Sequence, residues 1–364
     1  MMPSVSIVIP NWNGLHLLKQ FLSSVISAAN NYSSSNKAQT EIVVVDDAST
    51  DASVEWLIQS GFQIVGDHSS GDVFSRQSDM EDKRLILRLI RNEKNLGFGS
   101  ACNCGIAAAR NGLIFLLNND VKLSETAIEP LVQNFADQSV FAVHCRVYDL
   151  RKGRECGSGK LGSFSRGFLR VHRSYTVSEV AAGSLDLISI FAGGGSSMYD
   201  RNKFMEIGGF DELFAPFYWE DVELSYRAWK RGYRVKYEPR SIAYHMISST
   251  IGGLAARRTA RIQDRNRLIF NWIHLHDPAM LAKNFLWVAV LGITAPLRMR
   301  LGFLASLIEA TARIGRIRKR RAGEKRAAQR KDRDILEIFK LFASHPEIQA
   351  FDDYSELEVS KDPV

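Results

Sequence analysis

Short polar clusters stand at three points in the N-terminal half, each directly after an apolar run typical of a strand. They are Asn11 and Asn13 after residues 4–10, Asp46 and Asp47 after 41–45, and Asn118, Asn119 and Asp120 after 113–117. Carboxylates and amides of this kind suit hydrogen bonds to a base and a ribose, and their oxygens are ligands for a hard divalent cation. Open α/β sheets bind ligands beyond the carboxyl ends of their strands, so the clusters predict a nucleotide-type site at one sheet edge.

Two common nucleotide-binding motifs are missing. The dinucleotide fingerprint GxGxxG should follow the first strand, where the sequence instead reads Pro10-Asn11-Trp12-Asn13-Gly14. No GxxxxGKS or GxxxxGKT segment occurs, which excludes a P-loop enzyme. The chain also shows no convincing Ser/His or Cys/His arrangement for nucleophilic catalysis. Its four cysteines lack zinc-type spacing and fit a reducing cytoplasm.

A second chemical feature lies at Glu220 and Asp221, two acids at the expected start of a helix. Phe217, Tyr218 and Trp219 lead into them and offer aromatic surfaces that could hold a sugar. A helix N-terminus favours the ionised form of a carboxylate, which a general base needs. The alternative is that these acids only stabilise the helix dipole.

These residues must be positioned by alternating strands and helices, which predict an α/β fold with a mostly parallel sheet flanked by helices. The expected strands are 4–10, 41–45, 84–90, 113–117 and 234–237, and the expected helices are 14–30, 54–59 and 99–110. The last helix is rich in small residues and must pack closely. The polar stretches 30–40 and 66–83 predict surface loops.

Several motifs occur in the order seen in glycosyltransferase family 2, which the chain resembles over about residues 4–250. They are VIPNWNG at 8–14, VVDDASTD at 44–51, NLGFG at 95–99, LNND at 117–120, GGFDE at 208–212, FYWEDVEL at 217–224, Arg227, GYRV at 232–235 and His245. The sequence looks most like the bacterial rhamnosyltransferase-like branch. This resemblance implies a GT-A fold, a nucleotide-sugar donor and Mn²⁺ or Mg²⁺ as cofactor.

The resemblance also implies roles for individual residues. Asp221 corresponds to the general base, supported by Glu220, and Asp120 with His245 corresponds to the metal ligands. Asn118 stands where the family's metal motif has its first Asp, which suggests weaker metal binding. The donor-binding positions are Pro10, Asn11, Asn13, Asp46, Asn95, Gly97, Asn118, Asn119 and Asp120, and the acceptor-binding positions are Gly193, Gly194, Trp219 and Glu220.

Each assignment has a structural alternative. Asp46 could cap the following helix, Asp120 could form an Asx turn, and His245 could be a core or loop histidine. Asn95 and Gly97 could belong to an ordinary turn, and the 193–195 glycines to a plain flexible connection. For Asp51, helix capping is the favoured interpretation.

The C-terminal third differs in composition. We expect a domain at 1–250, a helical and membrane-associated extension at 251–312, and a basic helix with a polar tail at 313–364. Residues 285–297 are apolar but too short for a span, and 313–333 holds eleven Lys or Arg against two acids. This pattern favours peripheral contact with an anionic membrane surface. A solvated basic helix is the alternative, and nucleic acid is disfavoured because the run lacks aromatic residues.

Together these features predict an inverting glycosyltransferase. The expected donor is a dTDP- or UDP-sugar, possibly rhamnose, and the expected acceptor is a lipid-linked saccharide or cell-envelope glycan. The apolar N-terminal run ends at Pro10 without a basic segment before it, so we expect a cytoplasmic protein, peripheral on the inner face of the membrane. Alternatives are a catalytically idle nucleotide-sugar-binding subunit and a nucleotidyltransferase.

Overall fold

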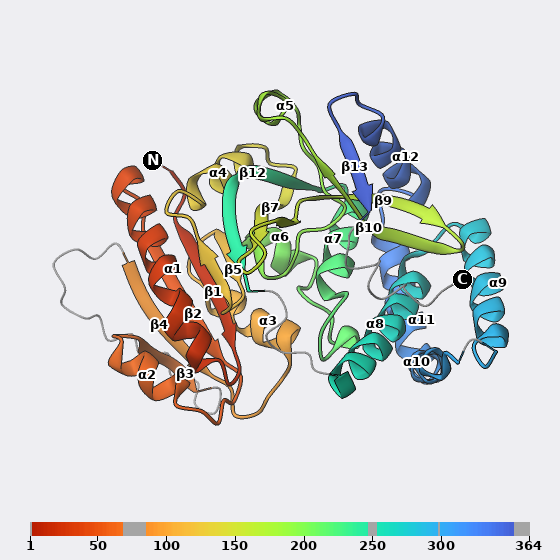
Figure 1. Ribbon diagram of the computed structural model, residues 1–364, viewed down its shortest axis with the longest axis horizontal. Coiled ribbons are helices and arrows are strands. Elements are labelled where there is room, and N and C mark those ends of the chain that lie inside the picture. Colours follow the sequence, from red (N-terminus) through yellow and green to blue (C-terminus); the bar gives the residue numbers. More distant parts are fainter. Residues whose placement is uncertain (1, 68–84, 247–252, 298, 353–364) are drawn as a thin grey trace. The chain divides into compact units, whose positions relative to one another are not determined.

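The computed structural model describes residues 2–67, 85–246, 253–297 and 299–352 (Figure 1). It divides the chain into two compact units. The first consists of residues 1–158, 192–216 and 236–247, and the second of 159–191, 217–235 and 248–364. The second unit therefore includes two segments from inside the span 1–250. The predicted boundary near residue 250 and residues 68–83 of the predicted loop lie outside the described residues.

The first unit is built on a mixed sheet that runs in the order β3-β4-β2-β1-β5-β11-β7-β12-β6, with β8 paired to β7. The strands are β1 (Val5–Asn11), β2 (Thr40–Asp46), β3 (Gln63–Asp67), β4 (Leu85–Arg91), β5 (Leu113–Leu117), β6 (Val121–Leu123), β7 (Val140–Asp149), β8 (Glu155–Gly157), β11 (Ser196–Asp200) and β12 (Arg234–His245). The pairs β1–β2, β1–β5, β2–β4 and β3–β4 are parallel, and β11 is antiparallel to both β5 and β7. The predicted mostly parallel α/β sheet is confirmed.

Helices cover both faces of this sheet. They are α1 (Leu15–Asn36), α2 (Ser53–Gln59), α3 (Phe98–Ala108), α4 (Ile128–Gln133) and α6 (Arg201–Glu206), with short 3₁₀ turns η1 (Asn134–Ala136) and η2 (Glu212–Phe214). Helix α1 packs on the side of β1 that carries Ile7, and α3 on the side that carries Val8. A methyl group added to Gly105 of α3 would stand 2.5 Å from Val8 Cγ1, so the predicted close packing of this small-residue helix is confirmed.

Helix α1 continues through most of the stretch 30–40, where a loop was predicted. That prediction is wrong because polar residues of this stretch find partners inside the fold. Tyr32 is buried and donates to Pro3 O at 2.6 Å, while Ser33 Oγ lies 2.8 Å from Thr40 Oγ1. The helix ends at Asn36, and Lys37, which follows it, adopts a left-handed conformation.

The second unit combines a three-stranded antiparallel sheet, in the order β13-β10-β9, with helices. Its elements are β9 (Gly159–Ser165), β10 (Phe168–Thr176), β13 (Gln349–Asp352), α5 (Glu179–Ser184), α7 (Glu220–Lys230), α8 (Gly253–His274), α9 (Pro278–Thr294), α10 (Leu301–Thr311), α11 (Ile314–Ala327) and α12 (Asp332–Ala343). The helical character predicted for the C-terminal region is confirmed. Within the ranges that the structure describes, no helix has the length and apolarity needed to cross a membrane.

Helix α7 is almost entirely buried within this unit, including four of its charged residues, three of which have charged partners. Glu223 pairs with Arg227 one turn later and also contacts His274 Nε2 at 2.9 Å. Lys230 Nζ lies 2.6 Å from Asp332 of α12. Buried charges are tolerated when they are paired, so residues from α8 and α12 are required for α7 to be packed.

Candidate active site

The first unit brings the predicted donor-binding residues Asn11, Asp46 and Asn119 together. Asn11 pairs with Asp46 in the parallel register of β1 and β2. Asn11 Nδ2 donates to Asp46 Oδ1 at 3.2 Å, and Asn119 Nδ2 donates to Asn11 Oδ1 at 2.8 Å. Asp46 Oδ2 also accepts the N–H of Ser49, four residues before α2 begins. Asp46 is therefore fixed in an Asx-type turn and does not cap that helix.

The neighbouring Asp47 organises the loop that holds Asn95 and Gly97. Its carboxylate accepts hydrogen bonds from Asn92 Nδ2 at 2.8 Å, Leu96 N at 3.0 Å and Gly97 N at 2.9 Å. Asn95 Oδ1 also accepts from Gly97 N, at 3.1 Å. Asp47 thus satisfies amides that could otherwise bind an anion, and donor contact by Asn95 and Gly97 stays a prediction.

Asn13 is occupied in a neighbouring turn. Its Oδ1 accepts from Thr50 N at 2.7 Å and from Asp51 N at 3.3 Å, which joins the loops after β1 and β2. Asp51 accepts from Leu15 N, the first residue of α1, and from Ser53 N. Burial by itself would raise the pKa of Asp51, but these hydrogen bonds outweigh it and hold the pKa below 3.8. This is the capping role expected for Asp51.

Asp120 and His245 lie next to each other at the end of the sheet. His245 pairs with Val121 in the β12–β6 ladder, and His245 Nε2 is 3.1 Å from Asp120 Oδ1. Apart from this contact with His245, Asp120 Oδ1 is buried without a hydrogen bond, and so is Asn118 Oδ1, within the described part of the chain. A carboxylate, an imidazole and an orphaned amide oxygen fit a divalent cation that also takes diphosphate oxygens. The described residues contain no group of three or more His, Cys, Asp or Glu placed to hold a metal alone.

The glycine loop 193–195 packs closely on its surroundings. A methyl group on Gly195 would stand 2.6 Å from the Asn118 side chain, and Asn118 N donates to Gly195 O at 3.0 Å. Ser197 Oγ donates to Gly193 O at 2.7 Å and lies 2.9 Å from Nδ1 of the buried His144. The loop is therefore held in place by its contacts, and the alternative interpretation as a plain flexible connection does not fit this packing. Contact of Gly193 and Gly194 with the acceptor stays a prediction.

Glu220 and Asp221 begin α7 in the second unit, and their environments differ. Glu220 is buried, and its Oε2 has no hydrogen-bond partner among the residues that the structure describes. Burial, followed by the charge of Asp221, holds the pKa of Glu220 well above 4.5. Asp221 is half-buried, and its Oδ1 accepts from Val222 N at 2.8 Å. Glu220 is therefore the carboxyl disposed to stay neutral.

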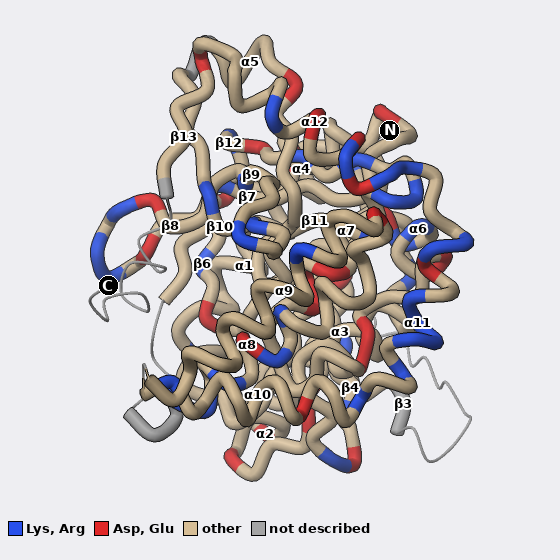
Figure 2. Tube along the Cα trace, turned by 90° about the vertical axis from the view of Figure 1, so that its right-hand side faces the viewer, with Lys and Arg blue, Asp and Glu red and all other residues tan. Residues whose placement is uncertain are grey.

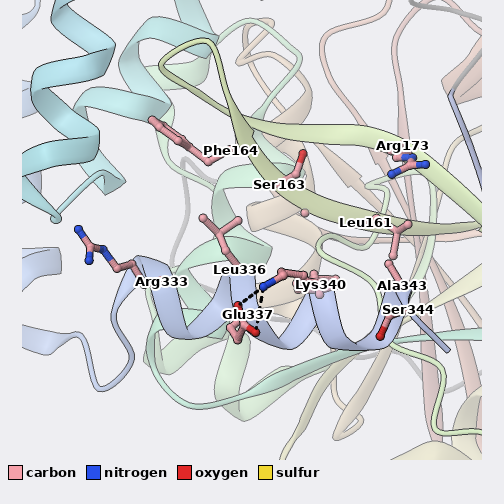
Figure 3. Close-up of a pocket in the computed structure, with 12 residues that line it drawn as sticks. Leu161, Ser163, Phe164, Arg173, Arg333, Leu336, Glu337, Lys340, Ala343 and Ser344 are labelled. Carbon is pink, nitrogen blue, oxygen red and sulfur yellow. Dashed lines mark hydrogen bonds and ion pairs between the residues drawn. The ribbon is translucent and has the colours of Figure 1, made fainter.

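Trp219, predicted to contact the acceptor, is buried in the second unit. Its ring meets His172 edge-on at 5.6 Å between centroids and Phe270 at 5.2 Å. A groove with a cavity volume of about 640 Å³ also lies in this unit, between β9 and α12, and none of the predicted site residues lines it. Figure 3 shows the ion pair of Glu337 and Lys340 on its helical wall.

Comparisons with known proteins identify the family and the fold of the chain. Residues 6–208 match the family described as Glycosyl transferase family 2, and residues 113–315 match Glycosyl transferase family group 2. The chain belongs to glycosyltransferase family 2, and its fold is GT-A.

Among curated relatives, the chain is 25 % identical over 178 residues to poly-β-1,6-N-acetyl-D-glucosamine synthase of Staphylococcus aureus, covering 49 % of this chain and 40 % of that protein. It is 24 % identical over 261 residues to polypeptide N-acetylgalactosaminyltransferase 3 of Drosophila melanogaster, covering 68 % and 36 %. The chain thus spans well under half the length of these relatives. A solved structure of GalNAc-T7 with UDP, GalNAc and Mn²⁺ matches at a TM-score of 0.60 and 16 % identity, covering 95 % of this chain and 58 % of the other.

Proposed function

We propose that the protein is an inverting glycosyltransferase that moves a sugar from a nucleoside-diphosphate donor to an acceptor hydroxyl. The observation that carries this proposal is the cluster of Asn11, Asp46 and Asn119 at the strand ends of a family 2 chain. Asp120 and His245 would hold a Mn²⁺ or Mg²⁺ ion against the diphosphate, where it would offset charge on the leaving group.

We propose Asp221 as the general base. The acceptor oxygen attacks the anomeric carbon while the bond from that carbon to the diphosphate oxygen breaks, and the acceptor proton passes to the Asp221 carboxylate. A single displacement inverts the anomeric centre and needs no covalent enzyme intermediate. The position of Asp221 at the start of α7 supports the ionised state, because the helix dipole favours it there.

For the donor we propose a UDP- or dTDP-sugar, with rhamnose as the sugar that the branch resemblance suggests. The names of the relatives add UDP-linked N-acetylhexosamines to the set worth testing. The acceptor we propose is a lipid-linked saccharide or a cell-envelope glycan.

A thermal-shift screen of UDP-, dTDP- and GDP-sugars with and without Mn²⁺ should single out the donor, because a ligand that binds only the folded state raises apparent stability. A transfer assay with that donor then tests the reaction. Nucleoside diphosphate with a glycosylated product supports the proposal. Donor binding without transfer or hydrolysis would indicate an idle binding subunit, and release of pyrophosphate would indicate a nucleotidyltransferase.

We also propose that α9 and α10 contact the inner face of the cytoplasmic membrane. Several of their large apolar side chains are exposed, including Ile293 at 76 %, Leu297 at 84 % just after α9, and Ile308 at 70 %. Helix α11 supplies the basic charge, and Figure 2 shows Lys and Arg clustered along it. Apolar insertion combined with attraction to anionic headgroups is the pattern of interfacial helices.

The membrane proposal is tested by substitution, because deleting residues 281–364 would also remove Asp332, the buried partner of Lys230. Ile293→Ser with Leu297→Ser should abolish co-sedimentation with anionic liposomes, since inserting each side chain is worth roughly 1.5–3 kcal/mol. Leu341→Ser, at a position 63 % exposed on α12, is the matched control. If the double variant binds the liposomes as well as the wild-type protein does, the proposal that α9 and α10 contact the membrane is refuted.

A further inference from the structure

The backbone just before α7 adopts a conformation that ordinary residues rarely take. Tyr218 and Trp219 have φ angles of 70° and 75°. In this left-handed region the Cβ atom crowds the backbone, and neither residue is a glycine. Two such residues in succession persist only where the surrounding structure holds them. Because Glu220 and Asp221 follow immediately, this turn fixes where both carboxyl groups begin.

The side chain of Asn266 holds the turn from α8. Its Nδ2 donates to Tyr218 O at 2.7 Å and to Phe217 O at 3.1 Å, so one amide group binds two successive carbonyl oxygens. Asn266 is fully buried, at 0 % exposure. A buried hydrogen bond without competition from water constrains the backbone more strongly than an exposed one.

The orientation of this amide is set by its neighbour. Arg265 Nε donates to Asn266 Oδ1 at 2.9 Å, and a guanidinium can only donate. Oδ1 must therefore face Arg265, which directs the Nδ2 donors at the two carbonyls. Arg265 in turn pairs with Glu309 of α10 at 3.5 Å. We call the two hydrogen bonds from Asn266 Nδ2 to the carbonyls of Phe217 and Tyr218 the clamp. The clamp is thus part of a connected set of interactions within the second unit.

Asn266 lies on a face of α8 whose residues contact first the turn before α7 and then α7 itself. Phe270, one turn later, packs on Trp219 at 5.2 Å and on Tyr226 at 5.5 Å. His274, one further turn on, contacts Glu223. Residues four apart share one helix face, so α8 sets both the turn and the placement of the helix that follows it.

We propose that Asn266 is a positioning residue for Asp221, acting through the carbonyls of Phe217 and Tyr218. The inference rests on the proposed role of Asp221 as general base. Without the clamp the turn can relax toward ordinary φ values, which shifts the carboxylate relative to the acceptor proton. A displacement of about 1 Å lowers turnover by as much as 10²-fold, whereas the proposed donor-binding residues belong to the first unit.

Asn266→Ala is compared with Asn271→Ala, a matched control on the same helix. Asn271 is also fully buried, and its side chain makes two hydrogen bonds, accepting from Leu169 N and donating to Arg267 O. Asn266→Ala should lower kcat roughly 10–10²-fold with donor Kd nearly unchanged, while Asn271→Ala keeps kcat within a few-fold at a similar loss of stability. If both variants lose activity in proportion to stability, or if Asn266→Ala keeps its kcat, the proposal is overturned. Asn266→Leu retains the volume and serves where alanine prevents folding.

A double-mutant cycle with Tyr218→Gly compares the loss of kcat caused by Asn266→Ala in two backgrounds, a difference that a general loss of stability does not produce. Glycine takes a positive φ without steric cost, so the turn should depend less on Asn266 in that background. The loss of kcat caused by Asn266→Ala should then shrink markedly, and an undiminished loss would count against the clamp.

Amide hydrogen exchange separates failure of this inference from failure of the proposed function. Glu223 N donates to Trp219 O at 2.8 Å, and its exchange should accelerate in Asn266→Ala but not in Asn271→Ala. If the wild-type protein transfers no sugar yet this difference appears, the clamp stands and the proposed function fails. If transfer occurs and exchange is unchanged, the clamp is refuted.

Discussion

Asp221→Asn and Glu220→Gln form a matched pair of substitutions, because each removes a carboxyl group and nearly preserves its shape. Glu220 is 7 % exposed with a raised pKa, so glutamine replaces a group that is already disposed to be neutral. Asp221 is half-buried and begins the same helix. Adjacent helical side chains diverge by about 100°, so the two rarely face one substrate atom.

The expected effects on turnover differ in size. Asp221→Asn should lower kcat roughly 10²–10⁴-fold, the usual contribution of acid–base catalysis, with donor affinity nearly unchanged. Glu220→Gln should act mainly on the KM for the acceptor. A coupled assay of nucleoside diphosphate release, with Kd for the donor measured separately, distinguishes the two. Near-normal turnover in Asp221→Asn together with an inactive Glu220→Gln would show that the wrong carboxylate was chosen.

The raised pKa of Glu220 also predicts how stability depends on pH. A carboxyl group with a higher pKa in the folded protein binds protons more tightly there than in the unfolded chain. Its contribution is therefore most favourable below pH 4.5 and declines as pH rises toward the folded pKa, by about 1.4 kcal/mol per pH unit. Glu220→Gln should remove this decline, and urea unfolding at a series of pH values measures it. A parallel pH dependence in variant and wild type would contradict the burial argument.

Four further substitutions, at three residues, test the surrounding framework. Asp120→Ala should sharply weaken Mn²⁺-dependent binding of the nucleoside diphosphate without unfolding the protein, and unchanged affinity by titration calorimetry would remove Asp120 from the site. Asp47→Ala leaves three donors without their acceptor and should cost roughly 2–4 kcal/mol of unfolding free energy in urea, so a neutral result would deny its role in the loop. Asp332→Ala breaks a buried ion pair with Lys230 and should cost about 3–5 kcal/mol. The pKa of Asp332 lies below 3.8 because its interactions with Lys230 and Tyr226 outweigh the effect of its burial. The stabilising contribution of the Asp332 charge is therefore present above pH 3.8 and is lost as the pH falls through the folded pKa. Asp332→Asn should reduce this loss of stability at acidic pH.

The sheet and the meeting of polar side chains at its strand ends were predictable because strand ends carry their own signal. Apolar runs closed by Asn11, Asp46 and Asn118 pointed to one edge of the sheet, and the parallel register brings two of these residues side by side. It was harder to predict that Asp46 contacts Asn11 whereas Asp47 binds the loop that holds Gly97. Successive residues of a strand point to opposite faces, and which face meets which loop depends on packing that the sequence does not state.

Asn266 was missed for a related reason. A single asparagine inside a long helical pattern has no local signature, and the turn it holds lies almost fifty residues earlier. One signal was present: Asn266 stands four residues before Phe270 and eight before His274, which places a polar residue on a face that must be buried. Similarly, the end of α1 could not be found from its polar composition, because Tyr32 and Ser33 are satisfied by distant partners.

The ionic packing of α7 has a consequence for protein synthesis. Glu223 and Arg227 can pair with each other as soon as both have left the ribosome, but His274, which also contacts Glu223, is made later. The partner of Lys230, Asp332, follows about 100 residues after it. At usual translation rates this delay lasts about 5–20 s, during which the charges must remain hydrated and the helix cannot be buried. The second unit should therefore acquire its packed core only after α12 has emerged, later than the parallel strands of the first unit.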